Sequence, residues 1–273
     1  INEDGGIIDD FLVYKLSSTN YMLVVNASNA KKDFDWIFSH NDGNTDIIDI
    51  TDSKSIIAVQ GPNSRIALQK ITNIDLSSIS YYSFKKGSLL NYNNNIISNT
   101  GYTGELGFEL YVDRNSAEKI WNSLFEHNDL IEPIGLAARD TLRLEKGYCL
   151  YGNDINETRT PIEAGLSWIV NFNKDFIGKK KLILQKQNGV LNNLIGFIML
   201  EKGIPRKDYP ILDVNDNEIG IVTSGTMSPS IFKAIGMGYV NSQFSTFGNT
   251  IFILIRNKKI KASITNRVFY EKK

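Results

Sequence analysis

Two adjacent carboxylates near the start of the chain, in the segment GGIIDDFLVY, could take part in chemistry. Residues 6–14 are predicted to form a strand, in which neighbouring side chains point to opposite faces. Asp10 then shares a face with Ile8 and Tyr14, and Asp9 points the other way. A carboxylate among apolar groups costs several kcal/mol unless it is paired, hydrogen-bonded or at a cavity wall. Asp10 is therefore a candidate ligand-facing group; the alternative is the end of an edge strand with both acids in water.

A third carboxylate, Glu109, lies in the segment 99–112, NTGYTGELGFELYV. Its alternation places Phe108, Leu110 and Val112 on one face of a strand and Glu109 on the other. The preceding glycines predict a shaped turn, because glycine reaches positive φ and allows close approach. Their spacing, followed by a strand and not a helix, excludes a dinucleotide-binding fingerprint. Glu109 is either a ligand-binding carboxylate or an ordinary solvated one.

Two arginines, Arg139 and Arg143, lie four residues apart on a predicted helix over 136–146 that a glycine closes. At this spacing they share a face, which is mildly destabilising unless anions meet them. Asp140, Glu145 or an anionic ligand could supply that charge. Otherwise the pair forms a solvated basic face.

Composition excludes several classes of function. Thirty basic and thirty acidic residues give zero net charge at pH 7, so no polyanion-binding face, and hence no nucleic acid, is expected. The single cysteine, Cys149, excludes an intrachain disulfide. Because the sequence has only two histidines, His40 and His127, a His/Cys metal site is not expected. No run approaches the ~20 apolar residues of a membrane span.

The elements that must position these residues follow a repeated pattern. Three segments (21–37, 55–71 and 109–125) contain a strand and then a helix, with polar breaks predicted at 26–29 and 113–116. Strand-then-helix pieces separated by further strands predict split β-α-β units with helices packed on antiparallel sheets. The first part of the chain is therefore expected to be α+β.

The last part of the chain has a different character. Short strands separated by Gly, Pro, Asn or Lys turns predict a compact antiparallel β-domain, either a barrel or a jelly roll. The polar connector 185–193 marks a boundary, giving domains 1–188 and 189–273. The long polar loop 149–170 before it is of the sort that carries function. The expected strands are 195–200, 219–224, 234–240, 250–255 and 260–265.

Seven motifs, in order along nearly the whole chain, resemble the aminomethyltransferase family, the T-protein of the glycine cleavage system. The resemblance implies a cloverleaf of two ferredoxin-like antiparallel α+β lobes plus a C-terminal antiparallel β-barrel, around a folate pocket. The motifs are GGIIDD (5–10), VVNASNAKKDFDWI (24–37), GYTGELGFELYV (101–112), GLAARDTLRLEKGYCLYGND (135–154), PIEAGLSWIV (161–170), TSGTMSP (223–229) and GMGYV (236–240).

The resemblance also implies an activity. Family members take an aminomethyl group from the lipoyl arm of the partner H-protein. They transfer its one-carbon unit to the co-substrate tetrahydrofolate and release ammonia. The expected location is the bacterial cytoplasm, or the mitochondrial matrix in a eukaryote. The alternatives are a related folate enzyme with a different one-carbon donor, associated with demethylases or oxidases, and an inactive folate-binding remnant.

Five site residues are implied by position in the matching motifs. Asp10 matches the catalytic aspartate beside the reacting folate nitrogens, and Asn26 matches an asparagine near the pterin. Tyr102 matches a pocket tyrosine, and Glu109 the glutamate that binds the amino-pyrimidine edge. Arg139 matches an arginine that binds the anionic portion of the folate. Such a ligand would compensate the like charges of Arg139 and Arg143 on their helix.

Two departures from the family pattern are expected to matter. Family members carry several dozen residues before GGIIDD, and their absence here predicts a fragment or a truncated chain. If residues 1–273 are the whole polypeptide, we expect an incomplete first lobe, exposed apolar strands and marginal stability. Second, the segment GEL at residues 104–106 is often GED in glycine-cleavage members. GEL occurs among relatives fused to sarcosine and dimethylglycine oxidases.

Overall fold

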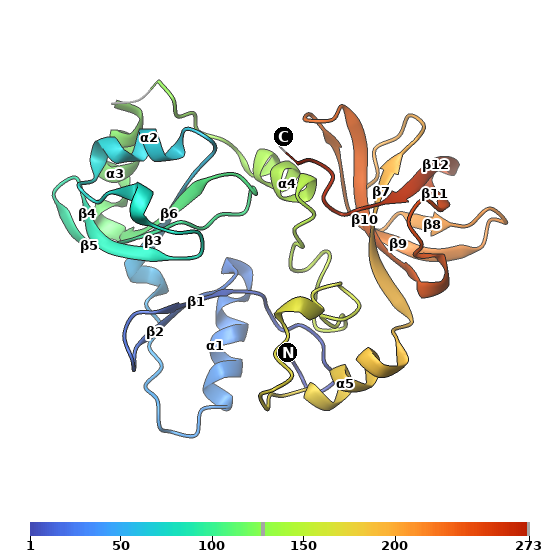
Figure 1. Ribbon diagram of the computed structural model, residues 1–273, viewed down its shortest axis with the longest axis horizontal. Coiled ribbons are helices and arrows are strands. Elements are labelled where there is room, and N and C mark those ends of the chain that lie inside the picture. The colour runs from blue at the N-terminus through green and yellow to red at the C-terminus, as the bar shows by residue number, and fades with distance from the viewer. Residues whose placement is uncertain (127–128, 272–273) are drawn as a thin grey trace. The chain divides into compact units, whose positions relative to one another are not determined.

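The computed structural model describes residues 1–126 and 129–271 and divides into two compact units (Figure 1). The first unit combines Ile1–Asn44 with Leu144–Lys273, and the second is Thr45–Arg143. His127 lies outside the described residues. Among the helices of the described residues, none is long and apolar enough to cross a membrane. The domain division at residue 188 stays a prediction.

The second unit is a four-stranded antiparallel sheet with helices on one face (Figure 1). The predicted alternation is confirmed, because Phe108, Leu110 and Val112 are fully buried in its core beside side chains of both helices. The strand order is β3-β6-β5-β4. The elements are β3 (Lys54–Gln60), α2 (Ser64–Leu68), β4 (Phe84–Leu89), β5 (Tyr92–Ser98), β6 (Gly107–Asp113) and α3 (Arg114–Glu126).

The polar break predicted at 113–116 is wrong. Strand β6 ends at Asp113 and helix α3 begins at Arg114, with no loop between them. The buried Ser116 hydroxyl donates to the Asp113 backbone oxygen at 2.8 Å. Ser116 therefore lies in the first turn of the helix, where its hydroxyl bonds back to the end of the strand, and is not part of a loop.

The first unit opens with a hairpin and a helix. Strands β1 (Leu12–Lys15) and β2 (Tyr21–Val24) pair antiparallel. After them a 3-10 turn, Ala27–Asn29, leads into α1 (Ala30–Ser39). The strand, break and helix predicted over 21–37 are thus confirmed.

The strand predicted over 6–14 is wrong for residues 6–11. The Ile7 amide is within hydrogen-bonding distance of the Asn156 and Arg159 carbonyl oxygens, at 3.0 and 2.9 Å, and neither belongs to a strand. Gly6 lies so close to Glu157 that a Cβ would be 1.7 Å from its backbone oxygen. The segment is thus fixed against an irregular loop, and the placement of Asp10 on a strand face is wrong.

The rest of the first unit contains a closed barrel of six antiparallel strands in the order β10-β7-β12-β11-β8-β9, which decides between the barrel and the jelly roll. Phe197, Ile211 and Ile253 are fully buried in its core. The three-residue β8 was not predicted. The strands are β7 (Asn192–Met199), β8 (Pro210–Leu212), β9 (Glu218–Ser228), β10 (Lys233–Asn241), β11 (Thr250–Ile255) and β12 (Lys258–Thr265).

Two helices border the connecting loop (residues 146–178). Helix α4 (Leu136–Glu145) precedes it, and Gly147 follows with φ 69°, which confirms the predicted helix and its glycine end. Helix α5 (Lys179–Asn188) follows it and takes up the first half of the connector predicted at 185–193. Within the loop, the short 3-10 turn Ser167–Ile169 is the longest helical piece described.

Asp154 fastens the connecting loop to the barrel. This carboxylate is 1% exposed and accepts hydrogen bonds from Thr223 Oγ1 at 2.5 Å and Ser224 Oγ at 2.8 Å, both on β9. It also accepts from the Leu150 amide at 2.9 Å. Hydrogen bonds to a charged group contribute more than neutral ones, so this contact should stabilise the loop strongly.

Asp154→Ala should therefore lower the free energy of unfolding by about 2–4 kcal/mol, because it leaves buried donors without their acceptor. Urea unfolding measures this. The matched control is Asp175→Ala, which removes an exposed carboxylate paired with Lys179 and should change stability by less than ~1 kcal/mol. Equal unfolding midpoints for the two variants would contradict the role of Asp154.

Candidate active site

Asp9 is the centre of a polar cluster in the first unit. Its Oδ2 accepts a hydrogen bond from the backbone amide of Asn26 at 3.1 Å. Its Oδ1 accepts from Asn26 Nδ2 at 2.8 Å and from Asn29 Nδ2 at 2.7 Å. Burial raises the pKa of Asp9, but hydrogen bonds from Asp33, Asn26 and Asn29 outweigh it and hold the pKa below its ordinary value. Asp9 is therefore ionised and ties its segment to the turn before α1.

Asp10 shares a donor with Asp9. Asn26 Nδ2 lies 3.1 Å from the Asp10 backbone oxygen and 3.2 Å from its Oδ1. Solvent reaches the Asp10 side chain, yet the surrounding atoms withhold part of its hydration. This desolvation, followed by the negative charge of Asp9, raises the pKa of Asp10 to about 6. Two neighbouring aspartates thus differ in acidity.

Asp33 on α1 belongs to the same cluster and was missed from the sequence. It is 2% exposed and lies within hydrogen-bonding range of Asp9. Burial, then the hydrogen bond with Asp9 and its charge, raise the pKa of Asp33 to about 7. One signal was available, because Ala30, Asp33 and Ile37 share one face of the helix. A charged residue between two apolar ones on one helix face indicates a buried polar contact.

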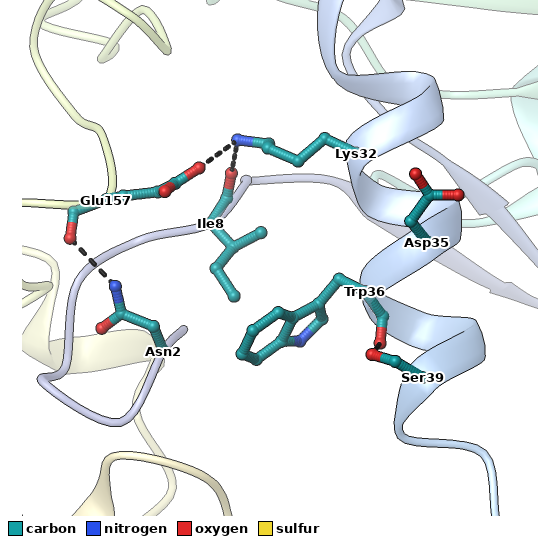
Figure 2. Close-up of a pocket in the computed structure, with 7 residues that line it drawn as sticks. All are labelled: Asn2, Ile8, Lys32, Asp35, Trp36, Ser39 and Glu157. Carbon is teal, nitrogen blue, oxygen red and sulfur yellow. Dashed lines mark hydrogen bonds and ion pairs between the residues drawn. The ribbon is translucent and has the colours of Figure 1, made fainter.

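Lys32, the neighbour of Asp33, ties three segments together (Figure 2). As Figure 2 shows, its Nζ donates to the Ile8 backbone oxygen at 2.5 Å and to Glu157 Oε1 at 3.1 Å. It also donates to Tyr151 Oη at 2.6 Å. Burial lowers the pKa of Lys32, but the bonds to Tyr151 and Glu157 outweigh it and raise the pKa above its ordinary value. Lys32 is therefore charged and holds the segment of Asp9 and Asp10 from its other end.

A pocket of about 280 Å³ lies beside this lysine, and Figure 2 shows the indole of Trp36 turned toward Ile8 and Asn2. None of the five predicted site residues lines it. We assign it no chemistry. Its lining residues are Asn2, Ile8, Lys32, Asp35, Trp36, Ser39 and Glu157.

Glu109 lies on β6 in the second unit, half-buried. Its Oε2 accepts from Thr100 Oγ1 at 2.5 Å and from Tyr111 Oη at 3.4 Å. The turn before it is shaped by Gln60, because a Cβ on Gly101 or Gly107 would come within 2.0 Å of the Gln60 side chain. Gln60 Nε2 donates to the Thr100 and Phe108 backbone oxygens at 3.1 and 3.2 Å, which holds the side chain against these two glycines.

Arg139 lies on α4 in the same unit. Its guanidinium carbon is 5.3 Å from the centroid of the Tyr102 ring, within the range of a cation–π contact. Arg143 is 1% exposed and pairs with Asp140, with Nε 2.8 Å from Oδ1. Asp140 therefore neutralises the charge of Arg143, whereas the exposed Arg139 contacts an aromatic ring.

The five predicted site residues divide between the two units. Asp10 and Asn26 lie in the first unit and contact each other. In the second, Tyr102 and Arg139 contact each other, and Glu109 is held by Thr100. Among the described residues no group of three or more His, Cys, Asp or Glu side chains could hold a metal ion. The five predicted site residues provide two carboxylates, an amide, a phenol and a guanidinium group.

Comparisons with known proteins cover nearly the whole chain. Residues 1–174 match the family described as the GCVT N-terminal domain, and residues 192–271 match the glycine cleavage T-protein C-terminal barrel domain. The aminomethyltransferase of Flavobacterium psychrophilum is 51% identical over 99% of this chain and 76% of its own length. That of Bacteroides fragilis is 50% identical over 98% of this chain and 75% of its own length.

A solved structure agrees with these relatives. The crystal structure of glycine cleavage system aminomethyltransferase T from Bartonella henselae superposes with a TM-score of 0.92. The two chains are 32% identical, and the match covers 99% of this chain and 74% of the other. The chain therefore belongs to the aminomethyltransferase family, the T-proteins of the glycine cleavage system.

Proposed function

We propose that this chain transfers the one-carbon unit of an aminomethyl group, carried on the lipoyl arm of an H-protein, to tetrahydrofolate. Family membership supports the reaction, and one observation carries the assignment of its chemistry. Asp10 is held by the Asn26 amide and has a pKa of about 6, beside an ionised Asp9. In this proposal residues 1–188 provide the folate-binding part, 189–273 form the barrel domain, and the protein works in the bacterial cytoplasm.

Asp10 has the properties that the transfer step needs. A folate nitrogen attacks the aminomethyl carbon as ammonia leaves, so positive charge develops at the attacking nitrogen. The bond from this carbon to the lipoyl sulfur then breaks, and the thiol leaves as a second folate nitrogen takes its place. An ionised carboxylate fixed beside that nitrogen stabilises the charge and orients the lone pair. A group with a pKa near the working pH also accepts a proton well. Asp10 is therefore proposed as the catalytic residue, with Asn26 holding it.

The residues of the second unit are proposed to bind the co-substrate. A carboxylate accepts two parallel N–H bonds from an amino-pyrimidine edge, and Thr100 already orients Glu109. Arg139 is proposed to bind the anionic portion of the folate, with its guanidinium placed by the Tyr102 ring. The relatives found are named aminomethyltransferases, so the reading as an oxidase-associated enzyme is not favoured.

Asp10→Asn should lower turnover by ~10²-fold or more, the range for a lost electrostatic or acid–base group. The measurement is the steady-state rate in a reconstituted glycine cleavage system. Folate binding should change much less. Asp4→Asn, an exposed acid in the same N-terminal segment, serves as the control and should keep wild-type turnover. A rate for Asp10→Asn within threefold of the wild type would remove Asp10 from the chemistry.

The activity of the wild type should depend on pH through Asp10. The ionised carboxylate is the active form, so kcat/KM should rise as the pH passes through about 6. Below that value the loss should approach tenfold per pH unit. Rates of the wild type and of Asp10→Asn, measured across a pH series, test this dependence. The residual activity of Asp10→Asn should lack this limb; if it keeps the limb, another group is responsible.

Glu109→Gln keeps the shape of the side chain but replaces one acceptor oxygen with a donor facing a donor. Tetrahydrofolate affinity should fall by about 10- to 150-fold, or ~1.5–3 kcal/mol. Calorimetric titration measures it, and Glu118→Gln on the exposed side of α3 is the matched control. Unchanged affinity in Glu109→Gln would show that this carboxylate does not contact the ligand.

A further inference from the structure

The carboxyl group of Asp33 is buried without a donor. The residue is 2% exposed and lies in the first turn of α1. Within the ranges 1–126 and 129–271, neither of its oxygens meets an N–H or O–H group. An ionised carboxylate in such a place costs several kcal/mol, and proteins avoid the cost by keeping the group protonated. The surroundings of Asp33 therefore favour its neutral form.

The group that Asp33 does face is another carboxyl, that of Asp9. Two carboxylates in contact cannot both be ionised, but one proton between them forms a strong O–H···O⁻ bond. The donors decide which of the two keeps the proton. Asp9 accepts from the amide nitrogens of Asn26 and Asn29, which stabilise its charge, and Asp33 has no such donor.

The other charged groups near Asp33 do not change this assignment. Asp10 adds negative charge and favours the protonated form, and Lys32 opposes it. The Lys32 ammonium, however, is directed to Ile8, Tyr151 and Glu157 and makes no hydrogen bond to Asp33. Burial and the Asp9 charge prevail, so the pKa of Asp33 is raised to about 7.

We propose that Asp33 is a positioning residue that carries a proton and donates it to Asp9, and that this bond holds the Asn26 amide which fixes Asp10. The contacts form one chain: Asp33 to Asp9, Asp9 to Asn26, and Asn26 to Asp10. If Asp33 loses its proton, two like charges meet at Asp9. The Asn26 side chain that bridges Asp9 and Asp10 then loses its fixed position.

Protonation of Asp33 can be tested without any assay of activity. A buried protonated carboxyl group gives an infrared C=O stretching band distinct from that of a carboxylate. The difference spectrum between wild type and Asp33→Asn at about pH 6 should contain this band, because most of Asp33 is then protonated. Asp35→Asn, two residues along α1 at an exposed ion pair with Lys31, should give no such band. A wild-type spectrum without the band would overturn the proposal.

The stability of the protein gives a second, independent measure. A raised pKa means that the folded state holds the proton longer than the unfolded state, so stability falls as the pH rises from 3.8 toward about 7. Relative to Asp33→Asn, the unfolding constant of the wild type should increase by up to tenfold per pH unit in that window. Asp35→Asn should follow the wild type. An identical pH dependence in wild type and Asp33→Asn would show that Asp33 does not hold the proton.

The positioning role rests on the function proposed above and needs activity. Asp33→Ala removes the donor and should lower turnover in the reconstituted system by ~10-fold or more, with folate affinity little changed. Asp33→Asn keeps a donor to Asp9 and should restore turnover to within about threefold. Equal turnover in the Ala and Asn variants would overturn the positioning role. Inactivity of the wild type would instead refute the proposed function, and the infrared and unfolding results would still decide where the proton lies.

Discussion

The placement of the candidate active-site acids depends on one interaction, the acceptance of hydrogen bonds by the Asp9 carboxylate. Residues 6–11 pair with no strand, so their backbone groups must find partners elsewhere. Ile7 finds them in the connecting loop, and Asp9 finds them in the turn of Asn26 and Asn29. Lys32 closes the other side through the Ile8 carbonyl. The irregular segment is thereby held at Ile7, Ile8 and Asp9, with Asp10 at its end.

The same device recurs where the connecting loop and α4 meet the barrel. Asp154 collects hydroxyl and amide donors from β9 and from its own loop. Glu145, at the last position of α4, accepts from the hydroxyl groups of Ser228 and Ser230 at 2.5 and 2.7 Å. Both carboxylates are 1% exposed. At these two places a buried acid surrounded by donors joins loop or turn residues to regular structure, because a carboxylate accepts several bonds at once.

Local patterns predict those parts of this fold in which each residue's place follows from its neighbours in sequence. The alternation of Phe108, Leu110 and Val112 and the spaced strands of the barrel are of this kind. The contacts of Asp33 with Asp9 and of Asp154 with Ser224 join residues far apart in the chain, and no periodicity encodes them. The strand prediction for residues 6–11 is wrong because apolar residues beside a strand continue its pattern even where a loop buries them. The resemblance implied all five site residues, whereas spacing alone singled out only Asp10, Glu109 and Arg139, each with an ordinary alternative.

The difference between Asp9 and Asp10 now has a physical basis other than strand faces. Asp9 is surrounded by donors and has a lowered pKa, so it is a poor proton acceptor. Asp10 shares a single amide group with it and has a raised pKa because it is partly desolvated and because the charge of Asp9 is close. Neighbouring titratable groups whose pKa values are pushed apart are the usual basis for separate roles in acid–base catalysis. One aspartate builds the site and thereby makes the other more basic, so the structural role of Asp9 and the chemical role proposed for Asp10 depend on each other.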